Sequence, residues 1–84
     1  MNTETPDVHA WLTERVAVYL RRTPAEIDTG VPMAEYGLDS LTALALSADV
    51  EDEFGVVLSA ETTWDNPTID ALSEVLGTLI EEKA

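Results

Sequence analysis

The amino-acid sequence predicts an all-α protein, a small four-helix bundle of three main helices and one short helix. Apolar residues recur every three or four positions in three separate stretches, which is typical of helices that bury one face. No stretch alternates apolar and polar residues as a half-buried strand does, and such helices cover one another's apolar faces by packing as a bundle. The 84 residues suffice for one small domain. We therefore expect a single domain over residues 1–84, with its core at about 6–81 and short flexible termini.

The first helix is expected over about residues 6–22. Thr5 can cap its start, and Pro6 suits the first helical position because it lacks an N–H group. Arg21 and Arg22 are expected in the last turn, where the helix dipole favours cations. The apolar positions at helical spacing are Val8, Leu12, Val16 and Leu20, flanked by Trp11 and Tyr19.

The segment after this helix has no sustained period. Residues 23–26 can form a single turn that points Ile27 inward. Residues 28–38 contain two glycines and a proline and are expected to form a loop. Its apolar anchors to the core are Val31, Met33 and Leu38.

The second half of the chain holds the other helices. Asp39 is predicted to cap a helix that runs to Phe54 and stops at Gly55. Residues 56–58 are expected to be a buried connection, and residues 59–64 a short third helix that ends before Asn66-Pro67. Thr68 caps the last helix, whose apolar stripe is Ile69, Leu72, Val75, Leu76, Leu79 and Ile80.

The second helix has two apolar faces on a wheel of 3.6 residues per turn. One core cannot cover both faces, so either this helix is buried all round or one face docks against another protein. We favour docking, because an exposed apolar patch edged by charge usually marks an interaction site. The core face is Ala43, Leu46, Val50 and Phe54. The opposite face, called the docking strip below, is Leu41, Leu44, Ala45 and Ala48 with the acidic end Glu51 and Asp52.

Ser40 lies at the N-terminal end of this helix, beside the docking strip. Backbone N–H groups and the helix dipole at that end favour a phosphate group. Taken alone, however, a serine at a helix start is usually only a capping residue.

The composition excludes several classes of function. Seventeen Asp and Glu residues oppose four Lys and Arg residues, a formal net charge of −13, which disfavours binding to nucleic acid or to anionic membranes. Partners with basic patches are favoured instead. The absence of cysteine removes disulfides, thiolate metal sites and a protein thiol nucleophile. With no signal-peptide pattern at residues 1–4 and no long apolar run, we expect a cytoplasmic monomer.

Several motifs together resemble those of a known family. The run from Gly37 to Leu41 resembles the phosphopantetheine attachment motif of carrier proteins, in which Asp-Ser-Leu opens the second helix. Residues 51–55 are similar to the acidic-aromatic end of that helix. Residues 64–69 with Leu72 are similar to the entry to the last helix in acyl carrier proteins of polyketide synthases. The resemblance covers about residues 8–80.

This resemblance implies a non-catalytic acyl carrier protein. A phosphopantetheinyl transferase would join the Ser40 hydroxyl to 4'-phosphopantetheine from coenzyme A, and Asp39 would help that enzyme hold magnesium. The arm's thiol would carry acyl intermediates as thioesters in polyketide or related fatty acyl biosynthesis. Partners would be a ketosynthase, acyltransferase or acyl-adenylate ligase with basic docking patches, met by Leu41, Leu44, Ala48, Glu51 and Asp52. The chain itself would hold no stable metal.

Two positions bear on the type of carrier. Many acyl carriers have an acidic residue where this chain has Ala45, so a close match to fatty-acid partners is not expected. Leu38 before Asp39 is similar to polyketide carriers, whereas peptidyl carriers more often have glycine there. A peptidyl carrier protein of a nonribosomal peptide pathway is the alternative.

Three functions unrelated to that of a carrier protein are alternatives. A serine hydrolase needs a histidine beside Ser40, but His9, expected to be solvated, lies in the first helix. A calcium loop at residues 49–60 lacks its glycine and its final glutamate. An acidic helical adaptor would share the helices and strip but give Ser40 no role. The aromatic residues Trp11, Tyr19, Tyr36, Phe54 and Trp64 are expected to be packing groups, and Leu46, Val50, Ile69 and Leu76 could open for an acyl chain.

Overall fold

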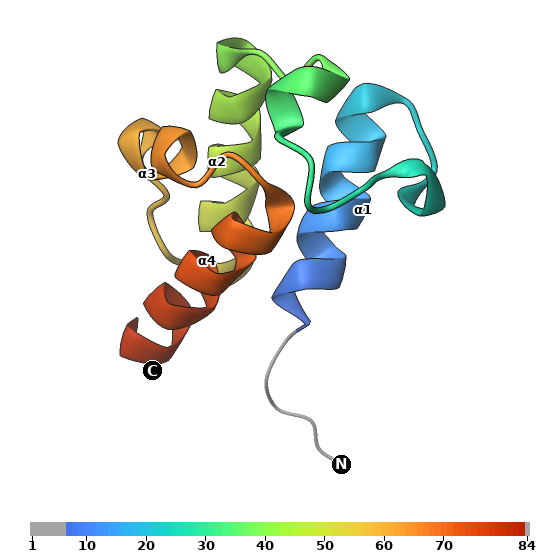
Figure 1. The fold of residues 1–84 in the computed structure, drawn as a ribbon. Helices are drawn as coiled ribbons and strands as arrows, with labels where there is room; N and C mark the ends of the chain where they lie inside the picture. The colour runs from blue at the N-terminus through green and yellow to red at the C-terminus, as the bar shows by residue number, and fades with distance from the viewer. Residues whose placement is uncertain (1–6, 84) are drawn as a thin grey trace.

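The structure is a computed structural model that describes residues 7–83. Those residues form four α-helices and two short 3₁₀ turns, with no strand among them, which confirms the predicted all-α bundle (Figure 1). The helices are α1 (Val8–Leu20), α2 (Ser40–Phe54), α3 (Ala60–Asp65) and α4 (Ile69–Lys83), and the turns are η1 (Pro24–Glu26) and η2 (Met33–Tyr36).

The two ends of α1 differ from the prediction. Asp7 is the N-cap, and its carboxylate accepts a hydrogen bond from the Ala10 N–H at 3.1 Å; the expected cap Thr5 and first residue Pro6 lie outside the described residues. The prediction that Arg21 and Arg22 occupy the last turn is wrong. The helix ends at Leu20 because Arg21 adopts a left-handed conformation, with φ of 59°, which turns the chain away from the axis.

The segment between α1 and α2 is more ordered than a plain loop. η1 forms as expected and Ile27 is buried, but residues 33–36 form the additional turn η2. Met33 and Leu38 are buried anchors as predicted, whereas Val31 is only half-buried. The spacing of apolar residues could not indicate η2, because a single 3₁₀ turn is shorter than one helical repeat.

Two backbone hydrogen bonds tie this segment to the start of α4. The Met33 N–H donates to the Pro67 carbonyl at 2.9 Å, and the Asp70 N–H donates to the Thr29 carbonyl at 3.1 Å. Because both bonds use main-chain atoms, they fix the path of the chain that leads into α2 without requiring particular side chains.

The ends of α2 are as predicted. Asp39 is the N-cap, and Gly55 ends the helix with a φ of 72°, a left-handed conformation that favours glycine. The following connection is only partly buried: Val56 and Leu58 face the core, but Val57 is 72% exposed. The predicted burial of Val57 is therefore wrong, since an extended backbone turns alternate side chains to opposite sides.

The two C-terminal helices begin at hydroxyl caps. The Ser59 hydroxyl accepts from the Thr62 N–H at 3.1 Å at the start of α3, and the Thr68 hydroxyl accepts from the Ala71 N–H at 3.0 Å at the start of α4. Helix α4 continues to Lys83, beyond the end of its apolar stripe.

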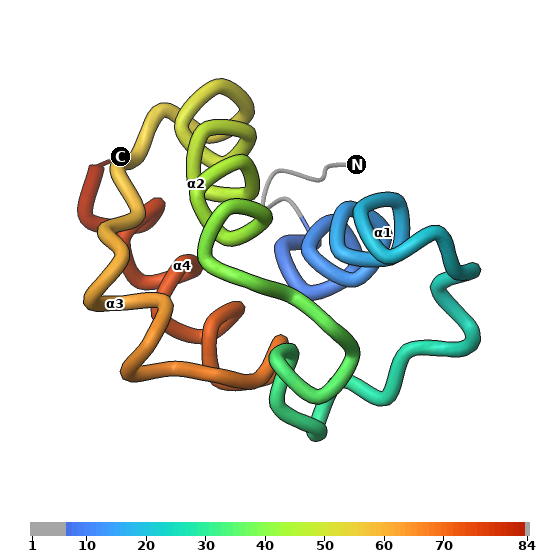
Figure 2. The backbone as a smooth tube through the Cα atoms, turned by 90° about the horizontal axis from the view of Figure 1, so that it is seen from above, coloured from blue at the N-terminus to red at the C-terminus, as the bar shows by residue number. Residues whose placement is uncertain are grey.

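The core lies between α1, α2 and α4, and α1 packs mainly against α4. Figure 2 shows α1 and α3 on opposite sides of α2. Within residues 7–83, every helix is too short or too polar to cross a membrane. The most deeply buried side chains are Leu12, Val16, Leu46, Val50, Ile69, Leu72 and Leu76.

Candidate functional site

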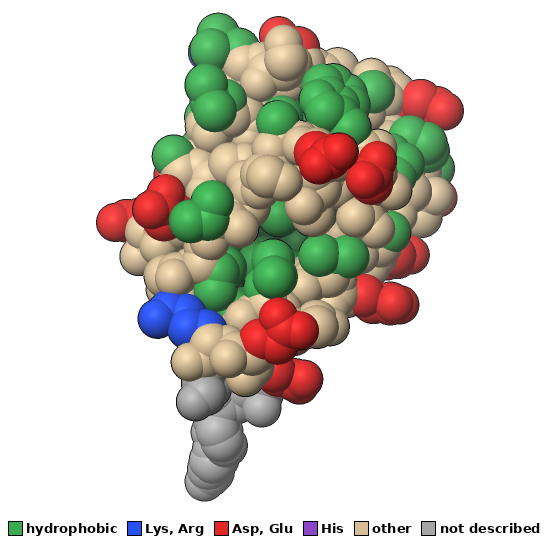
Figure 3. All heavy atoms as spheres, turned by 90° about the vertical axis from the view of Figure 1, so that its left-hand side faces the viewer, with side chains coloured by type: hydrophobic (Ala, Val, Ile, Leu, Met, Phe, Trp, Pro, Cys, Tyr) green, Lys and Arg blue, Asp and Glu red, His purple; other side chains and the backbone are tan. Residues whose placement is uncertain are grey.

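Helix α2 does present two apolar faces. Leu46 and Val50 are fully buried, whereas Leu41 is 74% and Leu44 is 65% exposed. The alternative in which α2 is buried all round is therefore wrong. Within the docking strip Ala48, Glu51 and Asp52 are also exposed, and Ala45 is half-buried. On the α3 side of the molecule, apolar patches lie among acidic side chains (Figure 3).

Ser40 is the first residue of α2, and it is exposed. The capping role belongs to its neighbour, because the Asp39 carboxylate accepts a hydrogen bond from the Thr42 N–H at 2.8 Å. That bond holds the pKa of Asp39 below its ordinary value. The Ser40 hydroxyl makes no hydrogen bond to any residue in 7–83, so it is available as a nucleophile in a partner's active site.

A groove of about 360 Å³ runs between α2 and α3 and has Ser40 in its wall. This volume is at the small end of the range for ligand sites, roughly 300–1,000 Å³. Exposed apolar atoms of the docking strip form one wall, and α3 forms the other. The lining residues are Ser40, Leu41, Ala43, Leu44, Ser47, Leu58, Ala60, Thr63 and Trp64.

Sequence reasoning missed the α3 wall of this groove. Trp64 was expected to be a packing group, but it is 59% exposed and lines the groove. The six residues of α3 are too few to show which face of the helix is buried. The only available signal was a large aromatic residue just before the Asn66-Pro67 break.

The residues expected to open for an acyl chain lie elsewhere. Leu46, Val50, Ile69 and Leu76 are all fully buried in the core, and none of them lines the groove. Of the residues predicted to form the core face of α2, Ala43 alone lines the groove. The space beside Ser40 is therefore on the surface, while the interior between α2 and α4 is closed.

The structure does not assemble a hydrolase triad. His9 pairs with Asp70, with 2.7 Å between Nε2 of His9 and Oδ1 of Asp70, and this pair joins α1 to α4. His9 is exposed, as expected, and its pairing with Asp70 is a contact that the sequence did not indicate. The hydrogen bond lowers the pKa of Asp70.

The acidic run at the end of α2 is partly engaged by α1. Asp49 accepts a hydrogen bond from the Tyr19 hydroxyl and lies 3.9 Å from an Arg15 guanidinium nitrogen. Within residues 7–83, no group of three His, Asp or Glu side chains is placed to hold a metal ion. Glu51 and Asp52 point to solvent and have no such partner among the described residues.

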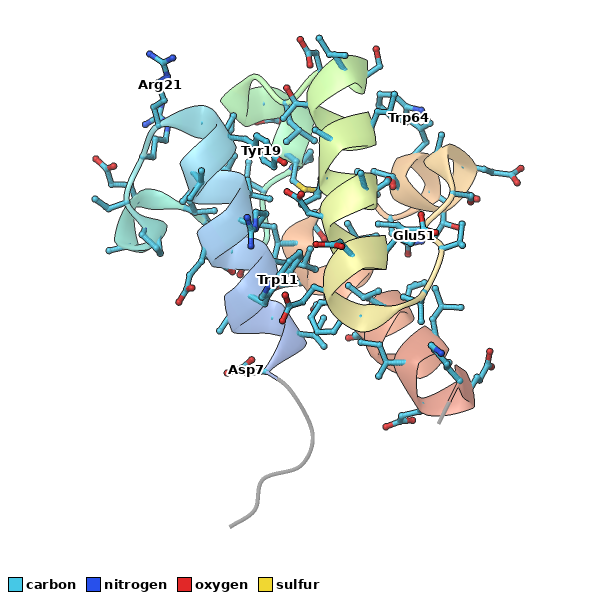
Figure 4. All side chains as sticks on the ribbon, turned by 180° about the vertical axis from the view of Figure 1, so that it is seen from behind. Asp7, Trp11, Tyr19, Arg21, Glu51 and Trp64 are labelled. Carbon is cyan, nitrogen blue, oxygen red and sulfur yellow. The ribbon has the colours of Figure 1, made fainter. Side chains whose placement is uncertain are left out.

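Aromatic packing sets how α2 lies against α1. The rings of Trp11 and Phe54 meet edge to face at 5.0 Å, and the Arg15 guanidinium lies 5.0 Å from the centre of the Trp11 ring. Figure 4 shows Trp11 and Tyr19 reaching from α1 toward α2, with Trp64 beyond α2. These contacts leave the docking strip turned away from α1.

Comparison with known proteins identifies the family. The family model described as "Phosphopantetheine attachment site" matches residues 10–76. The acyl carrier protein TtuC of Teredinibacter turnerae is 34% identical over 70 residues, which is 83% of this chain and 80% of that protein. The mycocerosic acid synthase-like polyketide synthase of Mycobacterium tuberculosis is 42% identical over 74 residues, which is 87% of this chain. The match spans only 3% of the length of that synthase.

Two solved structures share the fold over nearly all of both chains. A free-standing peptidyl carrier protein of Acinetobacter baumannii is 36% identical with a TM-score of 0.83, and covers 99% of this chain and 100% of its own. The acyl carrier protein LipD of Actinoplanes friuliensis is 35% identical with a TM-score of 0.74, and covers 98% of this chain and 99% of its own. The chain therefore belongs to the phosphopantetheine-binding family of acyl carrier proteins, whose covalent cofactor is 4'-phosphopantetheine.

Proposed function

We propose that Ser40 bears the 4'-phosphopantetheine arm and that the protein carries acyl intermediates on it as thioesters in polyketide or related fatty acyl biosynthesis. The observation that carries this proposal is an exposed serine with an unengaged hydroxyl at the first position of α2, inside the segment that the family model matches. The arm supplies the thiol that this cysteine-free chain lacks.

The residues around Ser40 fit a phosphodiester. The backbone N–H groups of the first turn of α2 point toward its N-terminus, where the helix dipole favours negative charge. The hydrogen bond from the Thr42 N–H lowers the pKa of Asp39 and so favours its ionised form. We propose that the second oxygen of this carboxylate helps the transferase hold magnesium during loading, while the first continues to cap the helix.

The docking strip gives partner enzymes a surface beside Ser40. Leu41 and Leu44 supply exposed apolar contacts, and Glu51 and Asp52 supply negative charge about two turns further along the helix. We propose that the transferase and a ketosynthase, acyltransferase or acyl-adenylate ligase meet this strip with basic patches. Such complementarity mainly raises the association rate and fixes orientation.

We further propose that the chain is not itself an enzyme. Its one histidine is engaged by Asp70, and the chemistry would come from the partners and from the thiol of the arm. The likeness to a free-standing peptidyl carrier protein supports an amino acid as a second candidate cargo. Loading of the arm by an amino-acid-activating enzyme, and not by an acyl-transferring one, would favour that candidate.

Loading followed by mass spectrometry tests the proposal. The protein is incubated with a broad-specificity phosphopantetheinyl transferase, coenzyme A and magnesium. The wild type should gain one arm and Ser40→Ala none. Ser59→Ala is the matched control, because Ser59 is another exposed serine at a helix start, and it should load like the wild type. An unmodified wild type would contradict the proposal and favour the acidic adaptor.

A further inference from the structure

The positive charges of this acidic chain are concentrated at one end of α1. Three of its four Lys and Arg residues, Arg15, Arg21 and Arg22, lie in the second half of α1 or directly after it. The fourth, Lys83, is the last residue of α4. A chain with a formal net charge of −13 thus has a local positive region, and it lies on the helix from which the docking strip is turned away.

A large apolar side chain is exposed in the same region. Val18 is 67% exposed, and it follows Trp11 and Arg15 at the spacing i, i+4 and i+7, which places the three residues on one face of α1. A hollow of about 200 Å³ is lined by Trp11, Glu14, Arg15 and Val18. That volume is below the usual range for small-molecule sites, about 300–1,000 Å³, so the hollow suits a side chain of another protein.

Two of the arginines are available to another molecule. Arg21 and Arg22 are exposed, and neither makes an ion pair with a carboxylate of residues 7–83. Figure 4 shows the Arg21 side chain pointing away from the bundle beyond the end of α1. Arg15 differs, since it lies 3.9 Å from Asp49 and is held there. Below, Trp11, Arg15, Val18, Arg21 and Arg22 are together called the basic face.

The helix dipole explains only part of this arrangement. It favours cations near a helix C-terminus, which accounts for positive charge at Arg21 and Arg22. It does not account for Val18, because an exposed apolar side chain gains nothing from the dipole. Nor does it account for an arginine at position 21, where φ is 59° and glycine would adopt the left-handed conformation more easily. Strained residues of this kind cluster at functional sites.

We propose that the basic face docks an acidic segment of a partner protein, a helix or loop that presents an apolar side chain between carboxylates. The apolar side chain would occupy the hollow beside Val18, and the carboxylates would pair with Arg21 and Arg22. A nucleic acid would pair with the arginines but would leave Val18 uncovered.

The overall negative charge does not prevent this contact. At physiological ionic strength, charges are screened beyond about 8 Å, so the arginines at the contact outweigh the carboxylates on the far side of the molecule. The docking strip attracts basic surfaces and the basic face attracts acidic ones, so the two surfaces select opposite charges. The inference is independent of the proposed attachment at Ser40.

Nuclear magnetic resonance titration of the isotope-labelled, unloaded protein tests this proposal. The probes are two synthetic helical peptides with the same row of leucines, flanked by glutamates in one peptide and by lysines in the other. The acidic peptide should move the indole N–H signal of Trp11 and the backbone amide signals of Val18 and Arg21. The basic peptide should instead move the signals of Glu51 and Asp52. No shift with the acidic peptide, or shifts only outside the basic face, would overturn the proposal.

Matched substitutions separate the basic face from net charge. Arg21→Gly should melt at or above the wild-type temperature, because glycine accepts a φ of 59°. It should nevertheless weaken binding of the acidic peptide by about two- to fivefold, the effect of one exposed ion pair. Lys83→Ala removes the same charge at the end of α4 and should leave binding nearly unchanged. Val18→Ser should also weaken binding without lowering the melting temperature, because Val18 is exposed. Equal weakening by Arg21→Gly and Lys83→Ala, or full binding by both Arg21→Gly and Val18→Ser, would overturn the assignment of the basic face.

Discussion

The Tyr19 hydroxyl of α1 donates a hydrogen bond to the Asp49 carboxylate of α2. This bond joins α1 to α2, the helix that begins at Ser40. It also raises the pKa of Tyr19, chiefly because the bond stabilises the protonated phenol. Asp49 is thereby engaged within the protein, and Glu51 and Asp52 remain as the acidic end of the docking strip.

Tyr19→Phe should lower the free energy of unfolding by about 1 kcal/mol, because it removes a hydrogen bond to a partly buried carboxylate. Urea denaturation measures the change. Transfer of the arm to Ser40 should proceed at the wild-type rate, since the docking strip faces away from α1. A variant as stable as the wild type would show that this bond contributes nothing to folding.

Acid stability should depend in part on Asp39. Its pKa is lowered in the folded protein by the hydrogen bond from the Thr42 N–H, so its stabilising contribution is fully present above its unfolded pKa of about 3.9. The contribution is lost as the pH falls through the lowered folded value. Asp39→Asn keeps a capping oxygen but does not titrate there, and melting curves from pH 6 to pH 2 should show a smaller loss for this variant. If the wild type and Asp39→Asn lost the same amount of thermal stability between pH 6 and pH 2, titration of Asp39 would not contribute to acid stability.

Truncation of Leu46 should mainly reduce the stability of the protein, whereas truncation of Leu44 should mainly reduce the efficiency of loading. Leu46→Ala should lower the free energy of unfolding by about 2–5 kcal/mol, because Leu46 is fully buried. Leu44→Ala should change it by less than about 0.5 kcal/mol, because Leu44 is 65% exposed. Loading kinetics should show the reverse order, with kcat/KM of the transferase reduced by Leu44→Ala. Retention of full kcat/KM in that variant would remove Leu44 from the docking strip.

Two glycines provide a second matched pair. Gly55→Ala should be destabilising by about 1 kcal/mol, because φ is 72° and the new Cβ would lie 2.9 Å from the movable Cε of Lys83. Gly77→Ala should be stabilising by about 0.5–1 kcal/mol, because Gly77 lies inside α4 with nothing within 4 Å of the new Cβ. Thermal denaturation should therefore move the two melting temperatures in opposite directions.

The acidic end of the strip should govern association with the transferase. Glu51→Lys with Asp52→Lys should reduce kcat/KM for loading about tenfold at low salt and weaken its salt dependence. Glu14→Lys on α1 with Glu74→Lys on α4, one turn after the Asp70 that pairs with α1, makes the same change in net charge on the α1 side of the molecule, away from the docking strip. Its effect should be much smaller. Equal effects of the two pairs would mean that net charge, and not the strip, attracts the partner.

Most of the fold was predictable because local signals agreed with one another. Asp39 and Gly55 mark the two ends of α2 by caps that act within one turn, and the apolar spacing of α4 identifies its buried stripe. The exposure of one face of α2 was predictable because a small bundle has a single core. That core cannot bury both Leu46 and Leu44, which lie on different faces of the helix.

Other features depended on contacts between segments far apart in the chain. Arg21 ends α1 in a conformation that its side chain does not favour, and η2 is supported by the bond from Met33 to the Pro67 carbonyl. The pairing of His9 with Asp70 spans 61 positions, so no local pattern indicates it. These outcomes follow from packing, which overrides weak local preferences.

The sequence by itself determined an acidic, cysteine-free helical bundle and placed Ser40 after a strong helix cap. Only the tertiary structure decided what lies beside that serine. It set α3 against α2, exposed Trp64, and formed a groove from side chains that local periodicity treats as unrelated. The physical reason is that caps and helical stripes act over a few residues, whereas a groove is the space left between whole helices once their cores have packed.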